Sequence, residues 1–203
     1  QRQMCIRDSI WGDAGNDNIN AGNGIDQVFG GLGDDTVAGG LGGDVIDGGD
    51  GADLLYGDNG AVDAVSGNID PTGDGDVIDG GAGNDSIYGG GGNDVIDGGD
   101  GNDLIDGGMG NNLLSGLAGD DLFLNDPGQL GFNSTFDGGV GFDTVDYSRS
   151  TGNLAVGGAR VGINIDLSNG AVAVVPVGGN VPDAFLSVEA AIGTLYDDVL
   201  SGG

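Results

Sequence analysis

The stretch from Gly30 to Tyr56 reads GGLGDDTVA-GGLGGDVID-GGDGADLLY, which is three consecutive nonapeptides. In each one, two glycines come first, a third glycine stands at position four, an aspartate at position six and an aliphatic residue at position eight. A fixed short period of this kind indicates a stacked repeat architecture in which every repeat is one structural unit.

The same pattern extends over most of Gly12 to Asp146. Five copies cover Gly12–Tyr56, five more cover Gly80–Leu124, and one copy stands apart at Gly138–Asp146. Position six is aspartate in every copy except the one that carries Asn112, and position eight is apolar in all of them. A chain that was merely rich in glycine and aspartate would not keep both registers at once, so the pattern predicts a folded stack.

Each position of the repeat has a physical reason. Glycine reaches backbone angles closed to other residues, so a G-G-x-G segment turns sharply and directs its carbonyl groups inward. Calcium takes six to eight oxygen ligands from carboxylates and backbone carbonyls. The three residues that follow the aspartate form a short strand whose middle side chain points inside. The repeat therefore predicts an all-β parallel β-roll with calcium in its turns.

These residues resemble the RTX (repeats-in-toxin) family of secreted bacterial proteins. The resemblance implies a right-handed parallel β-roll in which two nonapeptides make one coil, so that residues 18 apart stack. It also implies several Ca²⁺ ions, each held between two stacked turns by position-six carboxylates and nearby glycine carbonyls. The expected carboxylate ligands are Asp17, Asp26, Asp35, Asp44, Asp53, Asp76, Asp85, Asp94, Asp103, Asp121 and Asp143. The expected carbonyl ligands belong to Gly31, Gly33, Gly40, Gly42, Gly49, Gly51, Gly81, Gly83, Gly90, Gly92, Gly99 and Gly101.

The 18-residue coil predicts two ladders of position-six residues, one on each side of the roll. Before the interruption, Asp17, Asp35 and Asp53 form one ladder and Asp26 and Asp44 the other. After it, Asp76, Asp94 and Asn112 stack on one side and Asp85, Asp103 and Asp121 on the other. Asp76 lacks the full glycine turn before it, which makes its metal site weaker as a prediction.

The charge of the chain supports a role for cations. It contains 33 acidic and 4 basic residues and no histidine, with a formal net charge of −29. Aspartates on neighbouring strands about 4.8 Å apart repel by roughly 3 kcal/mol at an effective dielectric constant near 20. Several such pairs would exceed the stability of a typical domain, so the roll should not form without cations. The same charge opposes nucleic-acid binding.

Three segments stand outside the main pattern. Residues 1–9 contain QMCIRDS, which resembles a translated sequencing adapter, so we set them apart from the roll of residues 10–124. Asp58–Thr72 breaks the register and is expected to bulge from the roll as a loop. Residues 125–193 are expected to cap its last apolar rung, and residues 194–203 look like the start of a further repeat.

Within the expected cap, Val161–Leu167 and Ala171–Val177 alternate apolar and polar residues on either side of a turn signal, which favours a hairpin. Ala184–Ile192 is a short amphipathic stretch, with Asp183 as a candidate cap at its start.

The absence of histidine excludes a His-coordinated zinc centre and a Ser-His-Asp triad within this chain, and we do not expect an enzyme. We expect a monomeric, calcium-dependent folding module of an extracellular protein exported by a type I secretion machinery. No signal peptide and no apolar run of membrane length is visible. Two alternatives stay open: a structural or adhesive spacer that contacts a cell surface or an extracellular polysaccharide, and the carboxy-terminal part of a secreted metalloprotease or lipase.

Overall fold

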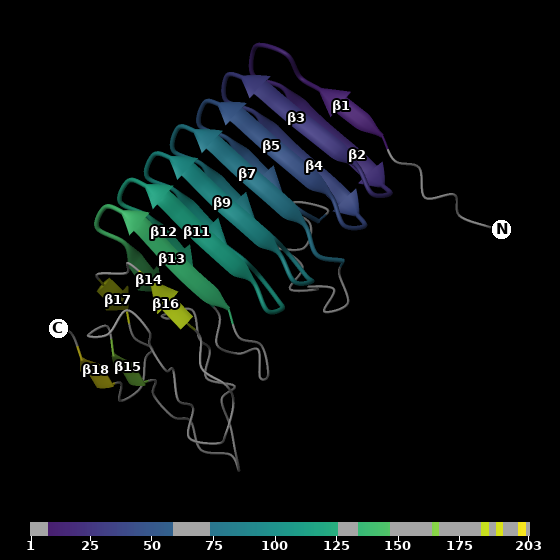
Figure 1. Cartoon of the computed structure of the whole chain (residues 1–203). Coiled ribbons are helices and arrows are strands. Elements are labelled where there is room, and N and C mark those ends of the chain that lie inside the picture. Colours follow the sequence, from purple (N-terminus) through teal and green to yellow (C-terminus); the bar gives the residue numbers. More distant parts are fainter. Residues whose placement is uncertain are drawn as a thin grey trace.

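The computed structural model describes residues 8–58, 74–125 and 134–146, together with four short strands at 164–166, 184–186, 190–192 and 199–201. Every regular element within these segments is a β-strand. The chain winds into a β-roll whose strands alternate between two parallel sheets, and successive coils lie side by side along the axis (Figure 1). The predicted all-β parallel β-roll is confirmed.

Each of the two main sheets has eight strands, and a third, two-stranded sheet lies farther along the chain. The first sheet consists, in order, of β1 (Ser9–Trp11), β3 (Gln27–Leu32), β5 (Val45–Asp50), β7 (Val77–Ala82), β9 (Val95–Asp100), β11 (Leu113–Ala118), β13 (Thr135–Val140) and β16 (Ala184–Leu186). The second consists of β2 (Asn18–Asn23), β4 (Thr36–Leu41), β6 (Leu54–Tyr56), β8 (Ser86–Tyr88), β10 (Leu104–Asp106), β12 (Leu122–Leu124), β14 (Thr144–Asp146) and β17 (Ala190–Ile192). The third pairs β15 (Asn164–Asp166) with β18 (Val199–Ser201).

The strands pair in the register that the 18-residue coil predicts. Gln27 pairs with Val45 in the next coil, and Thr36 pairs with Leu54 in the opposite sheet. Across the interruption Val45 pairs with Val77, so the register is the same before and after it. The sheets therefore continue unbroken on both sides of the interruption.

The core is a double row of apolar side chains between the two sheets. Position eight supplies almost all of it, because the middle residue of each strand points inward. The fully buried members are Val28, Val37, Ile46, Leu55, Ile78, Ile87, Ile96, Ile105, Leu114, Phe123, Phe136 and Val145. Phe136 is the one member that the repeat pattern did not include, and its ring packs edge-on against Phe123 with centroids 5.7 Å apart.

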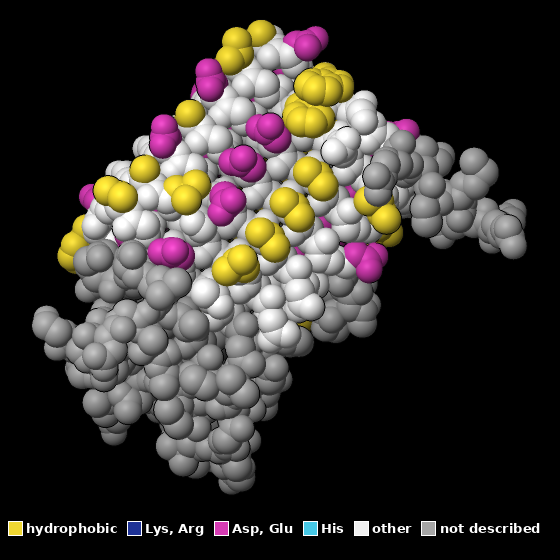
Figure 2. Space-filling view, in the orientation of Figure 1, with side chains coloured by type: hydrophobic (Ala, Val, Ile, Leu, Met, Phe, Trp, Pro, Cys, Tyr) yellow, Lys and Arg dark blue, Asp and Glu magenta, His cyan; other side chains and the backbone are white. Residues whose placement is uncertain are grey.

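The outer face of the first sheet carries a row of apolar side chains next to a row of acidic ones. Val45, Val77, Val95 and Leu113 form an exposed apolar row. Beside it runs an acidic row, Asp47, Asp79 and Asp97, and both rows are visible in Figure 2. At the amino-terminal end of the acidic row stand the stacked rings of Trp11 and Phe29, with centroids 4.0 Å apart.

Two sequence-based predictions for the carboxy-terminal part are wrong, and the first concerns Ala184–Ile192. A cap at Asp183 would start a helix in Ala184–Ile192. Residues 184–186 and 190–192 are instead strands β16 and β17. They add one more coil to the roll: Phe185 pairs with Phe136, and Ala191 pairs with Val145. The reason is that a short amphipathic segment next to an open sheet edge satisfies its backbone hydrogen bonds by pairing with that edge.

The remaining predictions for the carboxy-terminal part are only partly covered by the described residues. The copy at Gly138–Asp146 is not isolated, because β13 and β14 stack in register on β11 and β12. Asn164–Asp166 is a strand, as predicted, and pairs in parallel with Val199–Ser201. Its expected hairpin partner, Ala171–Val177, lies outside the described residues.

Candidate metal centre

The position-six residues form two continuous ladders along the turns. In each ladder the backbone N–H of one residue donates a hydrogen bond to a side-chain oxygen of its counterpart in the next coil. The acceptor is Oδ1 of an aspartate or asparagine, except at the end of one ladder, where it is Oγ of Ser134. Asp26 donates to Asp44 at 2.8 Å, and Asp35 donates to Asp53 at 2.8 Å. One ladder contains Asp17, Asp35, Asp53, Asp85, Asp103, Asp121 and Asp143. The other contains Asp8, Asp26, Asp44, Asp76, Asp94, Asn112 and Ser134.

Both ladders cross the interruption. The N–H of Asp44 donates to Asp76 at 2.7 Å, and that of Asp53 donates to Asp85 at 2.7 Å. Asp76 itself donates to Asp94 at 2.9 Å. Asp76 is therefore a full member of its ladder, although its turn lacks the usual glycines.

The second carboxylate oxygen of these aspartates is buried and has no hydrogen-bond partner. A buried polar atom without a partner costs about 1–3 kcal/mol, and a charged one costs more. A single case could be a local defect, but here the same atom lacks a partner in eleven turns. The atoms concerned are Oδ2 of Asp17, Asp26, Asp35, Asp44, Asp53, Asp76, Asp85, Asp94, Asp103, Asp121 and Asp143.

Asn112 shows what these oxygens lack. Its Oδ1 accepts the N–H of Asp94 at 2.9 Å, as the aspartates do in their own turns. Its Nδ2, which stands where an aspartate carries Oδ2, donates to the carbonyl oxygens of Gly107 at 2.8 Å and Gly108 at 3.3 Å. The turn thus presents oxygens that an electropositive group satisfies. With aspartate at position six, the carboxylate and the carbonyls all need such a group.

The same convergence recurs where aspartate is present. A Cβ placed on Gly30 would lie 2.5 Å from both Oδ2 of Asp35 and the carbonyl oxygen of Gly48. One small space beside Gly30 is therefore lined by a carboxylate and a backbone carbonyl from adjacent coils. Oxygen atoms of these two kinds are the ligands that Ca²⁺ takes.

Most of the glycine carbonyls predicted as ligands point along the axis toward the next coil. A Cβ on the stacked glycine would meet the carbonyl oxygen of its counterpart in the preceding coil. This holds for the carbonyl groups of Gly31, Gly33, Gly49, Gly51, Gly81, Gly83, Gly90, Gly92 and Gly101. Their assignment as calcium ligands stays a prediction, as does that of the ladder carboxylates.

Burial raises the pKa of many ladder carboxyls. The pKa rises to about 6 for Asp44, Asp85 and Asp121, to about 7 for Asp94 and to about 8 for Asp76. The accepted backbone N–H lowers each pKa, but desolvation outweighs it, and neighbouring carboxylates raise the values further. An ion-free roll therefore disfavours the charged form of these five carboxyls, and a divalent cation would restore it.

Among the described residues, no three acidic, histidine or cysteine side chains converge as a ready metal cluster. A cation here would need backbone carbonyls to complete its shell, which is a ligand set suited to a hard ion such as Ca²⁺ and not to a thiol- or imidazole-seeking metal. The residues present fit calcium. When bound, it would supply positive charge between successive coils, held by ladder carboxylates and glycine-turn carbonyls.

Comparison with known families agrees with this geometry. The RTX calcium-binding nonapeptide repeat matches the chain in four copies, at residues 7–28, 29–61, 71–105 and 95–123, which together cover more than half of it. The chain belongs to the RTX calcium-binding repeat family. Its RTX repeats imply calcium binding by a structural β-roll module. No curated protein matches the chain.

The RTX roll contains three ladder-associated residues that the sequence reasoning missed. Asp8 and Ser134 extend one ladder at its two ends, each nine residues before a recognised position six, Asp17 and Asp143. That spacing could have identified both. Asp58 lies in the interrupted turn, where no nine-residue signal exists, and only the stacking reveals its position. Within the described residues, the RTX roll contains no helix that is long and apolar enough to cross a membrane.

Proposed function

We propose that this chain is a calcium-dependent folding module of an extracellular protein. It stays unfolded where calcium is scarce and folds into the roll where calcium is abundant. The observation that carries the proposal is the buried Oδ2 atom left without a hydrogen-bond partner in eleven turns. Folding without a cation would bury all of these carboxylates unsatisfied.

The charge of the whole chain supports the same conclusion. A net charge of −29 with no histidine and few basic residues leaves the ladders without internal counterions. Metal binding that creates its own site is coupled to folding, so the binding free energy appears as folding free energy. Modules that work outside the cell are set to calcium concentrations of about 10⁻⁴–10⁻³ M.

Circular dichroism tests the proposal directly. We expect the full chain to lack β-structure in a chelator and to gain it cooperatively at about 10⁻⁴–10⁻³ M calcium. Magnesium at the same concentration serves as the control, because its small octahedral shell fits a carbonyl-lined turn poorly. A circular dichroism signal for β-structure that is the same with and without chelator would contradict the proposal.

Export fits this behaviour. A chain that cannot fold in calcium-poor cytoplasm is a suitable passenger for a type I secretion machinery, which we propose as its partner. Outside the cell it would fold as a monomer. Light scattering in the same calcium titration should give the mass of one chain.

A further inference from the structure

The outer face of the first sheet carries a row of exposed apolar side chains that contributes nothing to the core. Each member stands one residue before a buried core residue, so its side chain points away from the core. This apolar row is 37–51% exposed and consists of Val45, Val77, Val95 and Leu113. In the flanking coils the same position holds Gln27 and Thr135. The fold therefore accepts polar residues there, and the apolar row needs another explanation.

A second row, which is acidic, lies two residues farther along the same strands. It consists of Asp47, Asp79 and Asp97. These residues stand directly opposite one another on strands about 4.8 Å apart, where like charges destabilise a sheet. The described residues contain no lysine or arginine that could offset the repulsion, because all four basic residues of the chain stand outside them. A cationic partner would offset it.

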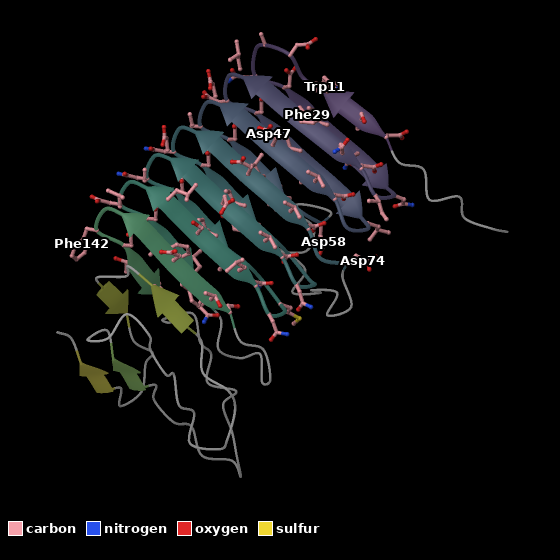
Figure 3. The ribbon with its side chains drawn as sticks, viewed as in Figure 1. Trp11, Phe29, Asp47, Asp58, Asp74 and Phe142 are labelled. Carbon is pink, nitrogen blue, oxygen red and sulfur yellow. The ribbon has the colours of Figure 1, made fainter. Side chains whose placement is uncertain are left out.

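The two rows lie on one open face of the roll. Figure 2 shows the acidic row beside the apolar row. Figure 3 shows Asp47 in line with Phe29 and Trp11 across successive strands, so the acidic row continues into two stacked aromatic rings. Trp11 is 63% exposed, and an indole ring also attracts lysine and arginine. The carboxylates and the aromatic pair favour the same kind of partner.

Charge decides between the classes of partner. A second copy of the chain would bring together two molecules with a net charge of −29 each. Nucleic acids and anionic lipid surfaces are repelled for the same reason. A neutral polysaccharide would leave the repulsion within the acidic row in place. The partner that satisfies both rows presents apolar and positively charged side chains in adjacent lines.

The spacing of the rows favours a helix over an extended chain. Along the roll axis each row repeats about every 4.8 Å. A helix lying along the axis repeats its face every 5.4 Å, so it drifts by less than about 2 Å over the three steps from Val45 to Leu113. A strand in the same direction repeats roughly every 6.7 Å and drifts by about 2 Å at each coil. The rows therefore match a helix of about three turns.

We propose that the outer face of the first sheet binds a cationic amphipathic helix of another protein, whose apolar stripe packs on the apolar row and whose flanking lysines or arginines contact the acidic row. The two rows are roughly 6.7 Å apart along each strand, a distance that long basic side chains span while their apolar stems lie on the sheet. The inference goes beyond calcium binding. Because the surface exists only in the folded roll, the calcium that folds the chain would also create it.

The probe is a synthetic peptide of about 18 residues, roughly 27 Å long as a helix, with leucine along one face and lysine along one flank of that face. Isothermal titration calorimetry measures its binding to the full chain at saturating calcium. Any cationic peptide is attracted to a chain with a net charge of −29, so the control is a scrambled peptide of the same composition at physiological salt. The amphipathic peptide should bind about tenfold more tightly than the scrambled one. Equal binding would overturn the proposal.

Two double variants with the same change in charge locate the binding surface. Asp47→Asn with Asp97→Asn neutralises two members of the acidic row. Asp50→Asn with Asp100→Asn neutralises two exposed aspartates of the same strands, β5 and β9. The first pair should weaken binding of the amphipathic peptide about fivefold, and the second should leave it unchanged. Equal weakening by both pairs, or by neither, would overturn the proposal.

The apolar row is tested separately. Val77→Thr with Val95→Thr keeps branched residues that suit a strand but removes apolar surface, and it should weaken binding. Leu32→Thr with Leu41→Thr changes two exposed leucines outside the apolar row, and it should not. Circular dichroism at saturating calcium shows that each variant is folded. If a threonine pair does not fold, the asparagine pairs decide, since removing like charges favours the sheet.

A peptide with two central prolines separates a helical partner from an extended one. Proline breaks a helix, so this peptide should bind no better than the scrambled one. If it binds as well as the amphipathic peptide, the partner is extended and the proposal is overturned. The measurement needs a folded roll but not its calcium dependence. A chain that is folded in chelator would overturn the proposed function and leave this test in place, whereas a folded chain that ignores the peptide would overturn only the binding surface.

Discussion

Asn112 and Asp103 occupy position six in opposite ladders, yet their side chains meet the turn differently. Nδ2 of Asn112 donates to two glycine carbonyls, whereas Oδ2 of Asp103 is buried without a partner. Both residues keep the Oδ1 contact to the preceding coil. The difference of one atom therefore separates a turn that is complete by itself from a turn that needs a cation.

This contrast gives a prediction for Asp103. Asp103→Asn should lose calcium from its turn but keep the N–H of Asp85 satisfied, as Asn112 does for Asp94. Asp103→Ala should lose calcium and also leave that N–H without a partner. At saturating calcium, Asp103→Ala should therefore be about 1–3 kcal/mol less stable than Asp103→Asn in urea unfolding.

Asp100→Ala is the control, because that side chain is exposed and stands outside both ladders. It should change neither the stability nor the number of calcium ions bound at saturation. Equal losses in Asp103→Asn and Asp103→Ala would contradict the role assigned to Oδ1.

Residue spacing alone could predict most of the ladder, because position six and position eight repeat every nine residues. It could not predict that Asp58 accepts the N–H of Gly91, since the insertion hides its position in the turn. It also could not show that Asn112 satisfies its turn through Nδ2, because that depends on the distance to Gly107 and Gly108. Spacing identifies a position, and stacking decides what the atoms at that position contact.

At the scale of the turn, comparing two glycines 18 residues apart distinguishes the effect of backbone strain from the effect of packing between coils. Gly15 and Gly33 have nearly the same backbone angle, with φ of 113° and 116°. A Cβ on Gly15 would meet nothing within 4 Å, whereas a Cβ on Gly33 would lie 2.8 Å from the carbonyl of Gly15. The two positions differ in whether another coil lies against the added atom.

We therefore expect Gly33→Ala to destabilise the roll more than Gly15→Ala. Both variants carry the cost of a positive φ, about 1–2 kcal/mol, and Gly33→Ala adds an overpacking cost of about 1–3 kcal/mol. Urea unfolding at saturating calcium measures the difference. Equal destabilisation would mean that the coils do not pack as closely as the stacked glycines indicate.

The strands themselves could be predicted wherever the nonapeptide survives. The last coil was missed because its signal is incomplete. The nonapeptide that ends in β16 keeps Gly178, Gly179, Asp183 and Phe185 at positions one, two, six and eight but has Val181 in place of the third glycine, and β17 has no glycine turn before it. What selects the strand is the open edge of β13 and β14, which offers hydrogen bonds in register. That contact depends on the rest of the roll, so the incomplete local pattern could not establish it alone.

For the molecule as a whole, the raised pKa values predict that protonation of the ladder carboxyls at low pH stabilises the fold in the absence of calcium. In the ion-free roll the pKa of Asp76 is about 8, that of Asp94 about 7 and that of Asp44 about 6, against an ordinary value of 3.8. A carboxyl whose pKa is raised by folding stabilises the fold below its unfolded pKa and loses this contribution as pH rises through the folded value. Without calcium, lowering the pH from 8 to 5 should therefore increase β-structure.

Circular dichroism of protein freed of calcium on a chelating resin checks this, and it avoids soluble chelators that weaken in acid. The sequence pI of about 4.1 sets the lower limit, since the uncharged chain would precipitate. With calcium present the sign reverses, because protons compete for the ligands, and the calcium midpoint should rise as pH falls. A β signal independent of pH in calcium-free protein would contradict the burial of these carboxyls.

The coil register has a mechanical consequence. Each 18-residue coil holds roughly 60 Å of extendable chain within an axial rise of about 4.8 Å, and it contacts only the coils beside it. Tension applied to the two ends therefore peels coils from an end one at a time, and the chain lengthens in equal steps. The turn between Asp58 and Asp74 carries extra chain, so its step is longer than the rest. Such a roll would act as a calcium-set extensible tether, stiff while its ions are bound and yielding as they leave.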